Sequence, residues 1–242
     1  MADTRAEEDL SKKEVSYLLS KTDYDRLIPV IQSYLQEEAS QPSTVSSLYF
    51  DTSDYQMIRD TINGHFASAI IKMTCCQDNP NDKSPAFLDI RKRQFPDQGG
   101  WEQSYRLQSN PISIHNYVKH GLADRTIKGN ELKQELAFLQ DRYPHLKPKI
   151  YLTYQESRLA APNFPGLSVS LARNLVFRDY DVSLSAGQHG WPLLDEGTVL
   201  MTIQSSQPLP EWLDRTLQAE KLPPLSLPKY AMAYLKLKDL AS

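Results

Sequence analysis

The chain has 242 residues, of which 40% are hydrophobic and 24% charged, and its formal net charge is -3. This composition is typical of a globular protein with enough chain to bury a core. A mildly acidic chain gives no general reason to expect a nucleic acid or an anionic membrane as partner. Any anion site must therefore be a local concentration of bases.

No segment approaches the roughly 18–20 apolar residues of a membrane span. The start of the sequence, MADTRAEEDLSKKE, lacks the apolar centre of a signal peptide. The only cysteines, Cys75 and Cys76, are neighbours and offer no disulfide framework. We therefore expect a protein of the reducing cytoplasm, with no membrane segment of its own.

The chain shows no linker or repeat that would divide it. We predict a disordered N-terminal tail over residues 1–11 and one domain over residues 12–242. Lys12 to Ser20 alternates as a strand does, with apolar side chains on one side and polar ones on the other.

A helix is expected next, in the stretch TDYDRLIPVIQSYLQEE, because its apolar residues recur at helical spacing. Thr22 with Asp25 resembles a capping pair. Pro29 should kink or delay this helix, because proline removes one backbone hydrogen bond.

Further strands and helices complete the pattern. A helical interlude runs from Ser113 to about Tyr143, and two closing helices begin near Pro210 and Pro228, where proline suits a first turn. The class is α+β, with mostly antiparallel strands and flanking helices. The remaining strand candidates are Val45–Phe50, Ala67–Cys75, Ala86–Gln94, Gln103–Leu107, Lys149–Tyr154, Leu167–Phe177 and Val199–Ser205.

The stretch AFLDIRKRQF has one mostly apolar face and one charged face, which carries Asp89, Arg91 and Arg93. Lys92 points the other way, toward solvent or a helix. Most other strands divide in the same manner. An open sheet with its polar face in water would explain this pattern, and so would a barrel that is polar inside and covered by helices outside.

Motifs along the chain resemble the VTC domain, the polyphosphate polymerase branch of the CYTH or triphosphate tunnel superfamily. SSLYFDTSDYQMIRDTINGH is similar to the SLYFDT motif of that family. Later stretches follow in the family's order: AFLDIRKR, LSVSLARNL, LMTIQSSQPLPEWL and LPKYAMA. The resemblance covers about residues 12–235. It implies a closed antiparallel β-tunnel of about eight strands, with a basic interior.

The resemblance also implies a chemistry. Family members transfer the terminal phosphate of ATP to polyphosphate, which requires positioning and charge neutralisation by bases and Mn²⁺ or Mg²⁺. Polyphosphate or a nucleoside triphosphate would be the partner, and a membrane protein is a further partner that the resemblance allows. The metal ligands it implies are Glu14 and Asp89. The phosphate-binding residues it implies are Lys12, Lys72, Arg91, Arg93, Arg106, Arg158 and Lys229.

Several interior positions depart from the family pattern. Thr202 stands where the metal-binding glutamate is expected, and a hydroxyl is a poor substitute for a carboxylate on Mg²⁺ or Mn²⁺. Gln204 replaces a lysine, and Glu156 stands where an arginine is expected. The other replaced positions are Ser16, Ile70, Thr74, Ser168 and Ala172.

Three hypotheses remain open. The domain binds polyphosphate, a nucleotide or a similar anion with weak or no catalysis; it is an active metal-dependent polyphosphate polymerase; or it is a structural or partner-binding relic of the tunnel fold. Outside the interior, we expect Asp51 with Arg59 and Asp60 to fix a turn and a short helix. Tyr49, Phe50, Trp212 and Tyr230 are expected in the core or its shell.

Overall fold

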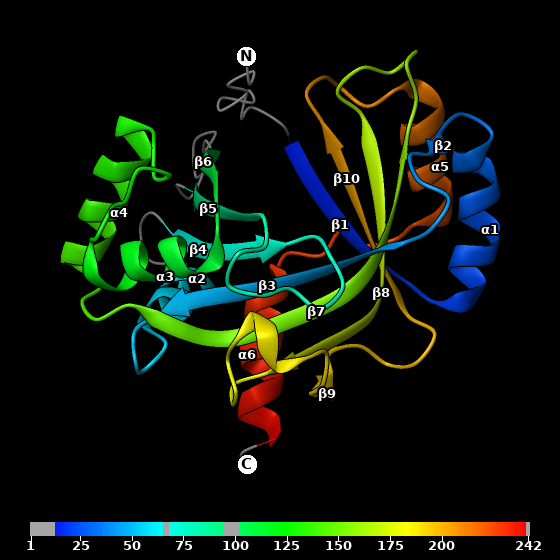
Figure 1. Ribbon diagram of the computed structural model, residues 1–242. Helices are drawn as coiled ribbons and strands as arrows, with labels where there is room; N and C mark the ends of the chain where they lie inside the picture. The colour runs from blue at the N-terminus through cyan, green and yellow to red at the C-terminus, as the bar shows by residue number, and fades with distance from the viewer. Residues whose placement is uncertain (1–12, 65–67, 94–101, 241–242) are drawn as a thin grey trace.

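The computed structural model describes residues 13–64, 68–93 and 102–240 (Figure 1). The predicted tail, residues 1–11, and Lys12 lie outside these ranges. The helices are α1 Lys21–Gln32, α2 Gln56–Asn63, α3 Pro111–His120, α4 Asn130–Arg142, α5 Glu211–Glu220 and α6 Lys229–Leu240. The strands are β1 Lys13–Leu19, β2 Gln36–Glu37, β3 Ser43–Asp51, β4 Ser68–Cys75, β5 Ala86–Arg93, β6 Glu102–Ser109, β7 Lys147–Ala160, β8 Ser168–Arg178, β9 Trp191–Pro192 and β10 Val199–Ser205.

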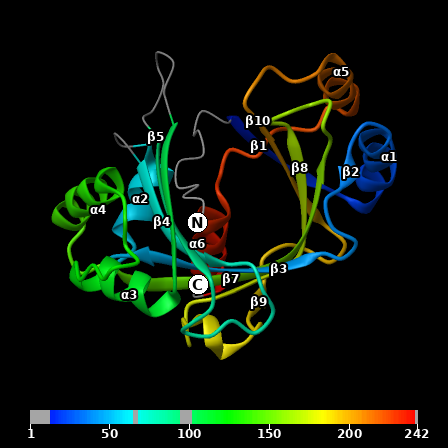
Figure 2. The ribbon, with the colours of Figure 1, turned by 45° about the horizontal axis from the view of Figure 1, so that its top comes forward.

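The strands form one antiparallel sheet in the order β1-β10-β8-β7-β3-β4-β5-β6, with β2 added to β7 and β9 to β8. Figure 2 shows that the sheet curls, so that its two ends face each other across a concave side. Together with the helices, this confirms the predicted α+β tunnel fold. Within the described residues the two end strands, β1 and β6, share no backbone pairing, so the wall is a half-barrel.

Helices cover the convex side of the sheet in two groups, because the apolar face of each strand alternates outward. One group is α1 and α5, which pack on β1, β8 and β10 through Leu27, Ile31 and Leu213. The other is α3 and α4, which pack on β4, β5 and β6 through residues such as Ile114 and Leu136. None of the described helices is long and apolar enough to cross a membrane.

The outward position of Lys92 is confirmed. Its Nζ lies 2.9 Å from a carboxylate oxygen of Glu135 on α4, and 5.2 Å from the centre of the Phe138 ring. Since neighbours on a strand point to opposite faces, this contact turns Asp89 and Arg91 toward the concave side.

The last helix, α6, lies on the concave side, where the rings of Tyr230 and Tyr49 stack with centroids 4.7 Å apart. The Tyr230 hydroxyl donates to Asp51, whose carboxylate also accepts the backbone N–H groups of Met57 and Ile58 at the start of α2. Asp51 is fully buried. The predicted role of Asp51 in fixing a turn and a short helix is therefore confirmed, and the same carboxylate also anchors α6. Its expected companions have other partners: Arg59 pairs with Asp54, and Asp60 accepts from Tyr143.

Some elements differ from the sequence prediction. The first helix was expected to run to Glu38, but α1 ends at Gln32, and Gln36–Glu37 form the short strand β2. The capping pair of α1 is Ser20 with Asp23, not Thr22 with Asp25, and the helix continues through Pro29 because its buried face is held on the sheet. Strand β7 is longer than expected: it runs on past Tyr154, through a register shift, to Ala160. Residues 155–158 of this strand are polar on both faces and give no alternation to detect.

Candidate functional site

The charged face of β5 points to the concave side, where it meets side chains from strands far away in the sequence. Cross-strand pairing places Lys72 beside Asp89 and Asp89 beside Arg106, in a row across β4, β5 and β6. On the opposite part of the curled sheet, pairing places Ser16 beside Thr202 and Thr202 beside Ser170. The concave face thus has a charged part and a hydroxyl-lined part.

A chain of polar contacts joins the two parts. Arg91 Nη1 lies 2.8 Å from Glu14 Oε2, and Gln204 Nε2 donates to the same oxygen at 3.0 Å. The side chains of Arg91 and Glu14 keep 31% and 26% of their exposure, so solvent reaches this ion pair. The pair lies between β5 and β1, which are not neighbours in the sheet.

The electrostatic surroundings keep Glu14 ionised. Burial raises the pKa of its carboxyl group, but the charges of Arg91 and Lys229 outweigh burial. With the hydrogen bonds from Arg91 and Gln204, they lower this pKa from 4.5 to about 2. Glu14 is therefore a permanent negative charge among the bases at any physiological pH.

Asp89 is the second carboxylate of the cluster, and its side chain is only 6% exposed. Its Oδ1 accepts from Arg106 Nε at 2.6 Å, and its Oδ2 lies 3.8 Å from Lys72 Nζ. Burial raises the pKa of Asp89, but the cations Lys72 and Arg106 outweigh it and hold that pKa below its ordinary value. Within the described residues, the buried Oδ2 atom has no hydrogen-bond donor.

Two lysines of the site are partly withdrawn from water. Burial is the largest influence on Lys72 and lowers its pKa from 10.5 to about 8, against the attraction of Asp89. Burial also lowers the pKa of Lys229, against the attraction of Glu14 and Glu156. The ammonium of Lys229, at the start of α6, lies 5.3 Å from the centre of the Tyr154 ring.

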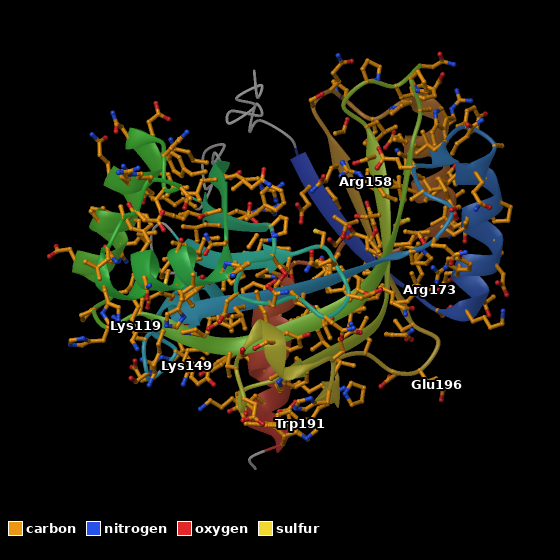
Figure 3. All side chains as sticks on the ribbon, viewed as in Figure 1. Lys119, Lys149, Arg158, Arg173, Trp191 and Glu196 are labelled. Carbon is orange, nitrogen blue, oxygen red and sulfur yellow. The ribbon has the colours of Figure 1, made fainter. Side chains whose placement is uncertain are left out.

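Neutral side chains that replace expected charges contact one another. The hydroxyl groups of Ser16 and Thr202 are 2.9 Å apart, and Thr202 is 5% exposed. Arg158 Nη2 donates to Ser168 Oγ at 3.0 Å, and Arg158 Nε lies 3.3 Å from Glu38. Figure 3 places Arg158 among the strands of this part of the sheet. These polar groups satisfy one another without an added ion.

The predicted site residues divide into three sets. Lys72, Asp89, Arg91 and Arg106 lie together, and Glu14 and Lys229 join them. Arg158 is on the same face but pairs with Glu38 toward its own edge. Lys12 and the side chain of Arg93 lie outside the described part of the structure. Ile70 faces the same side and packs in the apolar cluster around α6.

The described carboxylates do not fit a resident Mn²⁺ or Mg²⁺ ion. Such ions need several oxygen ligands. Here Glu14 Oε2 is occupied by Arg91 and Gln204, Asp89 Oδ1 by Arg106, and the Thr202 hydroxyl by Ser16. No group of three or more metal-ligating side chains occurs within the described ranges.

Sequence reasoning missed two contributors. Tyr154 supplies an aromatic face to Lys229, and Gln204 donates to Glu14, although it was expected only as the loss of a lysine. The strand pattern could have identified Gln204, because it lies two residues after Thr202 and therefore on the same face of the strand that pairs with β1. No local signal links Tyr154 to Lys229.

A cavity is lined by residues outside the charged cluster. It has a volume of about 670 Å³ and is lined by residues of α1, β8 and the connection after β9, among them Tyr24, Arg173 and Glu196. Figure 3 labels two of its lining residues, Arg173 on β8 and Glu196. None of the predicted site residues that the structure describes lines this cavity.

Solved structures with a similar arrangement share little sequence with this chain. A putative adenylate cyclase from Vibrio parahaemolyticus is 8% identical, with a TM-score of 0.44, over 91% of this chain and 96% of that one. The PH1819 protein from Pyrococcus horikoshii is 8% identical, with a TM-score of 0.48, over 93% and 99%. A chain of the Schizosaccharomyces pombe Mediator head module is 7% identical, with a TM-score of 0.47, over 87% and 90%.

At these identities and scores, the similar structures carry no argument about function. No curated protein sequence matches the chain significantly. The model of one protein family, the VTC domain, matches residues 11–238. The match takes in every described strand and helix except the end of α6, including the motifs of β3, β5 and β10. The chain belongs to the VTC domain family.

Proposed function

We propose that this VTC domain binds polyphosphate, a nucleoside triphosphate or a similar anion on its concave face, with weak or no catalysis. The observation that carries the proposal is the convergence of Lys72, Arg91, Arg106 and Lys229 around two carboxylates, Glu14 and Asp89. Glu156 also attracts Lys229, and four bases against these three acids still leave a local positive excess on a chain that is acidic as a whole. Such an excess suits phosphate oxygens.

Weak catalysis follows from what surrounds those bases. Phosphoryl transfer depends on charge neutralisation at the reacting phosphate, and removing one such group commonly costs about 10²–10³ in rate. Here Thr202 and Gln204 stand at charged positions of the family pattern, and both hydrogen-bond to neighbours on β1. Binding tolerates these changes better than turnover does, because binding requires net charge and no reaction geometry.

A calorimetric titration tests the proposal. The wild type is titrated with tripolyphosphate, ATP and long-chain polyphosphate, with and without Mn²⁺, beside Arg91→Ala and the control Arg215→Ala, whose side chain is 76% exposed on α5. We expect metal-independent binding that weakens by about tenfold or more in Arg91→Ala and is unchanged in the control. The affinity of the wild type for these anions should also fall as the salt concentration rises. Absence of binding by every anion would favour the structural relic.

A synthesis assay distinguishes the proposal from the polymerase alternative. If the proposal holds, incubation with ATP and Mn²⁺ should yield no polyphosphate above background. The double variant Thr202→Glu with Gln204→Lys should then improve metal-dependent nucleotide binding before it improves turnover. Robust wild-type synthesis that is lost in Arg91→Ala would overturn the proposal in favour of an active enzyme.

A further inference from the structure

The concave face has two walls of different chemistry. The basic wall consists of Lys72, Arg91 and Arg106, from the three neighbouring strands β4, β5 and β6, with Lys229 of α6 beside it. The hydroxyl wall comes from β1, β8 and β10 and consists of Ser16, Ser168, Ser170, Thr202 and the amide of Gln204.

The hydroxyl wall carries little net charge. Ser16, Ser170 and Gln204 remain half-buried and therefore within reach of a ligand. Arg158 of the neighbouring strand β7 contacts this wall at Ser168, and its guanidinium group is balanced by Glu38. A ligand on this wall thus meets groups that donate and accept hydrogen bonds without supplying charge.

The two walls are close enough for one ligand to contact both. Arg91 of the basic wall reaches Glu14 at 2.8 Å, and Glu14 accepts from Gln204 at 3.0 Å. A phosphate group that takes the place of the Glu14 carboxylate on Arg91 would lie beside Gln204. Its next substituent would then lie along the row formed by Ser16, Thr202 and Ser170.

A linear polyphosphate is charged along its whole length, and it is best matched by bases on all sides. A phosphorylated sugar or polyol carries its charge only on its phosphate groups, and its uncharged hydroxyl groups both donate and accept as serine and threonine do. We propose that the concave face is selective for such a phosphorylated sugar or polyol, with phosphate on the basic wall and hydroxyl groups on the hydroxyl wall. This inference rests on the proposed anion binding and names the class of anion.

The test compares two ligands of similar charge in the absence of metal: fructose 1,6-bisphosphate and tripolyphosphate. Ser16→Ala with Thr202→Val removes both members of a hydrogen-bonded pair, so that neither partner is left unsatisfied. Ser170→Ala is a second, single variant in case the double variant does not fold. Thr44→Val is the matched control, because Thr44 lies on the opposite face of β3 from Val45, which packs in the apolar cluster around α6 on the concave side. Lys72→Ala tests the basic wall.

We expect the wild type to bind the sugar bisphosphate at least as tightly as tripolyphosphate in calorimetry. The double variant should weaken the sugar bisphosphate about tenfold and tripolyphosphate less than about twofold, and Ser170→Ala should weaken the sugar bisphosphate about threefold. Thr44→Val should change neither. Equal effects of the hydroxyl variants on both ligands, or none on either, would overturn the selectivity and leave anion binding intact. Failure of both ligands to bind the wild type, or indifference of both to Lys72→Ala, would instead overturn anion binding, and the inference with it.

Discussion

Arg91 on β5 and Glu14 on β1 form an ion pair of 2.8 Å between strands that are not neighbours in the sheet. Strand β1 ends the sheet on one side, and β5 is next to the end on the other, so this pair connects the two parts of the half-barrel through side chains. The carboxylate of Glu14 therefore holds the base that an incoming phosphate would need.

Replacing Glu14 by glutamine should strengthen anion binding, because the competing charge is removed while the length of the side chain is kept. We expect the affinity for tripolyphosphate to rise about tenfold, as the site gains one unit of positive charge. Calorimetry measures the change. Glu211→Gln, at a carboxylate that is 77% exposed on α5, is the control and should have no effect. An unchanged affinity in Glu14→Gln would show that Glu14 does not compete with the ligand.

The same carboxylate should make stability depend on pH. The pKa of Glu14 is lowered from 4.5 to about 2 in the folded protein, so its contribution is fully present above about pH 4.5 and is lost as the pH falls toward 2. Urea denaturation at a series of pH values should show the stability difference between wild type and Glu14→Gln shrinking by on the order of 2–3 kcal/mol over this window. A difference that stays constant would mean that Glu14 is not ion-paired in solution.

Lys72 should make anion binding decline at mildly alkaline pH. Burial lowers its pKa to about 8, so its positive charge is lost as the pH rises through that value. A phosphate monoester is a suitable probe, because its second pKa is about 6 and the ligand does not titrate in this range. Affinity measured between about pH 7 and pH 9 should fall in the wild type and stay level in Lys72→Arg, whose guanidinium remains charged. Parallel profiles would refute the role of Lys72.

Arg178 should be among the most sensitive positions for stability, since its side chain is fully buried and lies 3.7 Å from the centre of the Tyr151 ring. Arg178→Leu should destabilise the fold by about 3–5 kcal/mol, because it removes a fully buried guanidinium group and leaves four backbone carbonyl groups without their donor. Thermal or urea denaturation measures this, with Arg215→Leu on the exposed face of α5 as the control. A loss below about 1 kcal/mol would contradict this role. The guanidinium donates to the backbone carbonyls of Asp181, Ser183, Gly187 and His189.

The class of fold and the division of each strand into an apolar and a polar face could be predicted from the amino-acid pattern. The period of two in β4, β5 and β10 is a local property that follows from the geometry of the strand, so it could be predicted that Asp89 and Arg91 share one face. That this face points inward was predicted from the resemblance to the family and not from the alternation. The ordered motifs predicted the family, which the family model confirms over residues 11–238.

The contacts among these inward side chains could not be predicted from the sequence and are known from the fold. The pairs Arg91 with Glu14, and Ser16 with Thr202, join residues 77 and 186 positions apart, and each depends on how far the sheet curls and on which strands become neighbours. A substitution such as Thr202 reads in the sequence as a lost metal ligand, whereas in the fold its hydroxyl group is hydrogen-bonded to Ser16. Alternation shows which side chains of a strand share a face, but a contact between strands also requires register and curvature, which arise from the packing of the whole sheet and its helices.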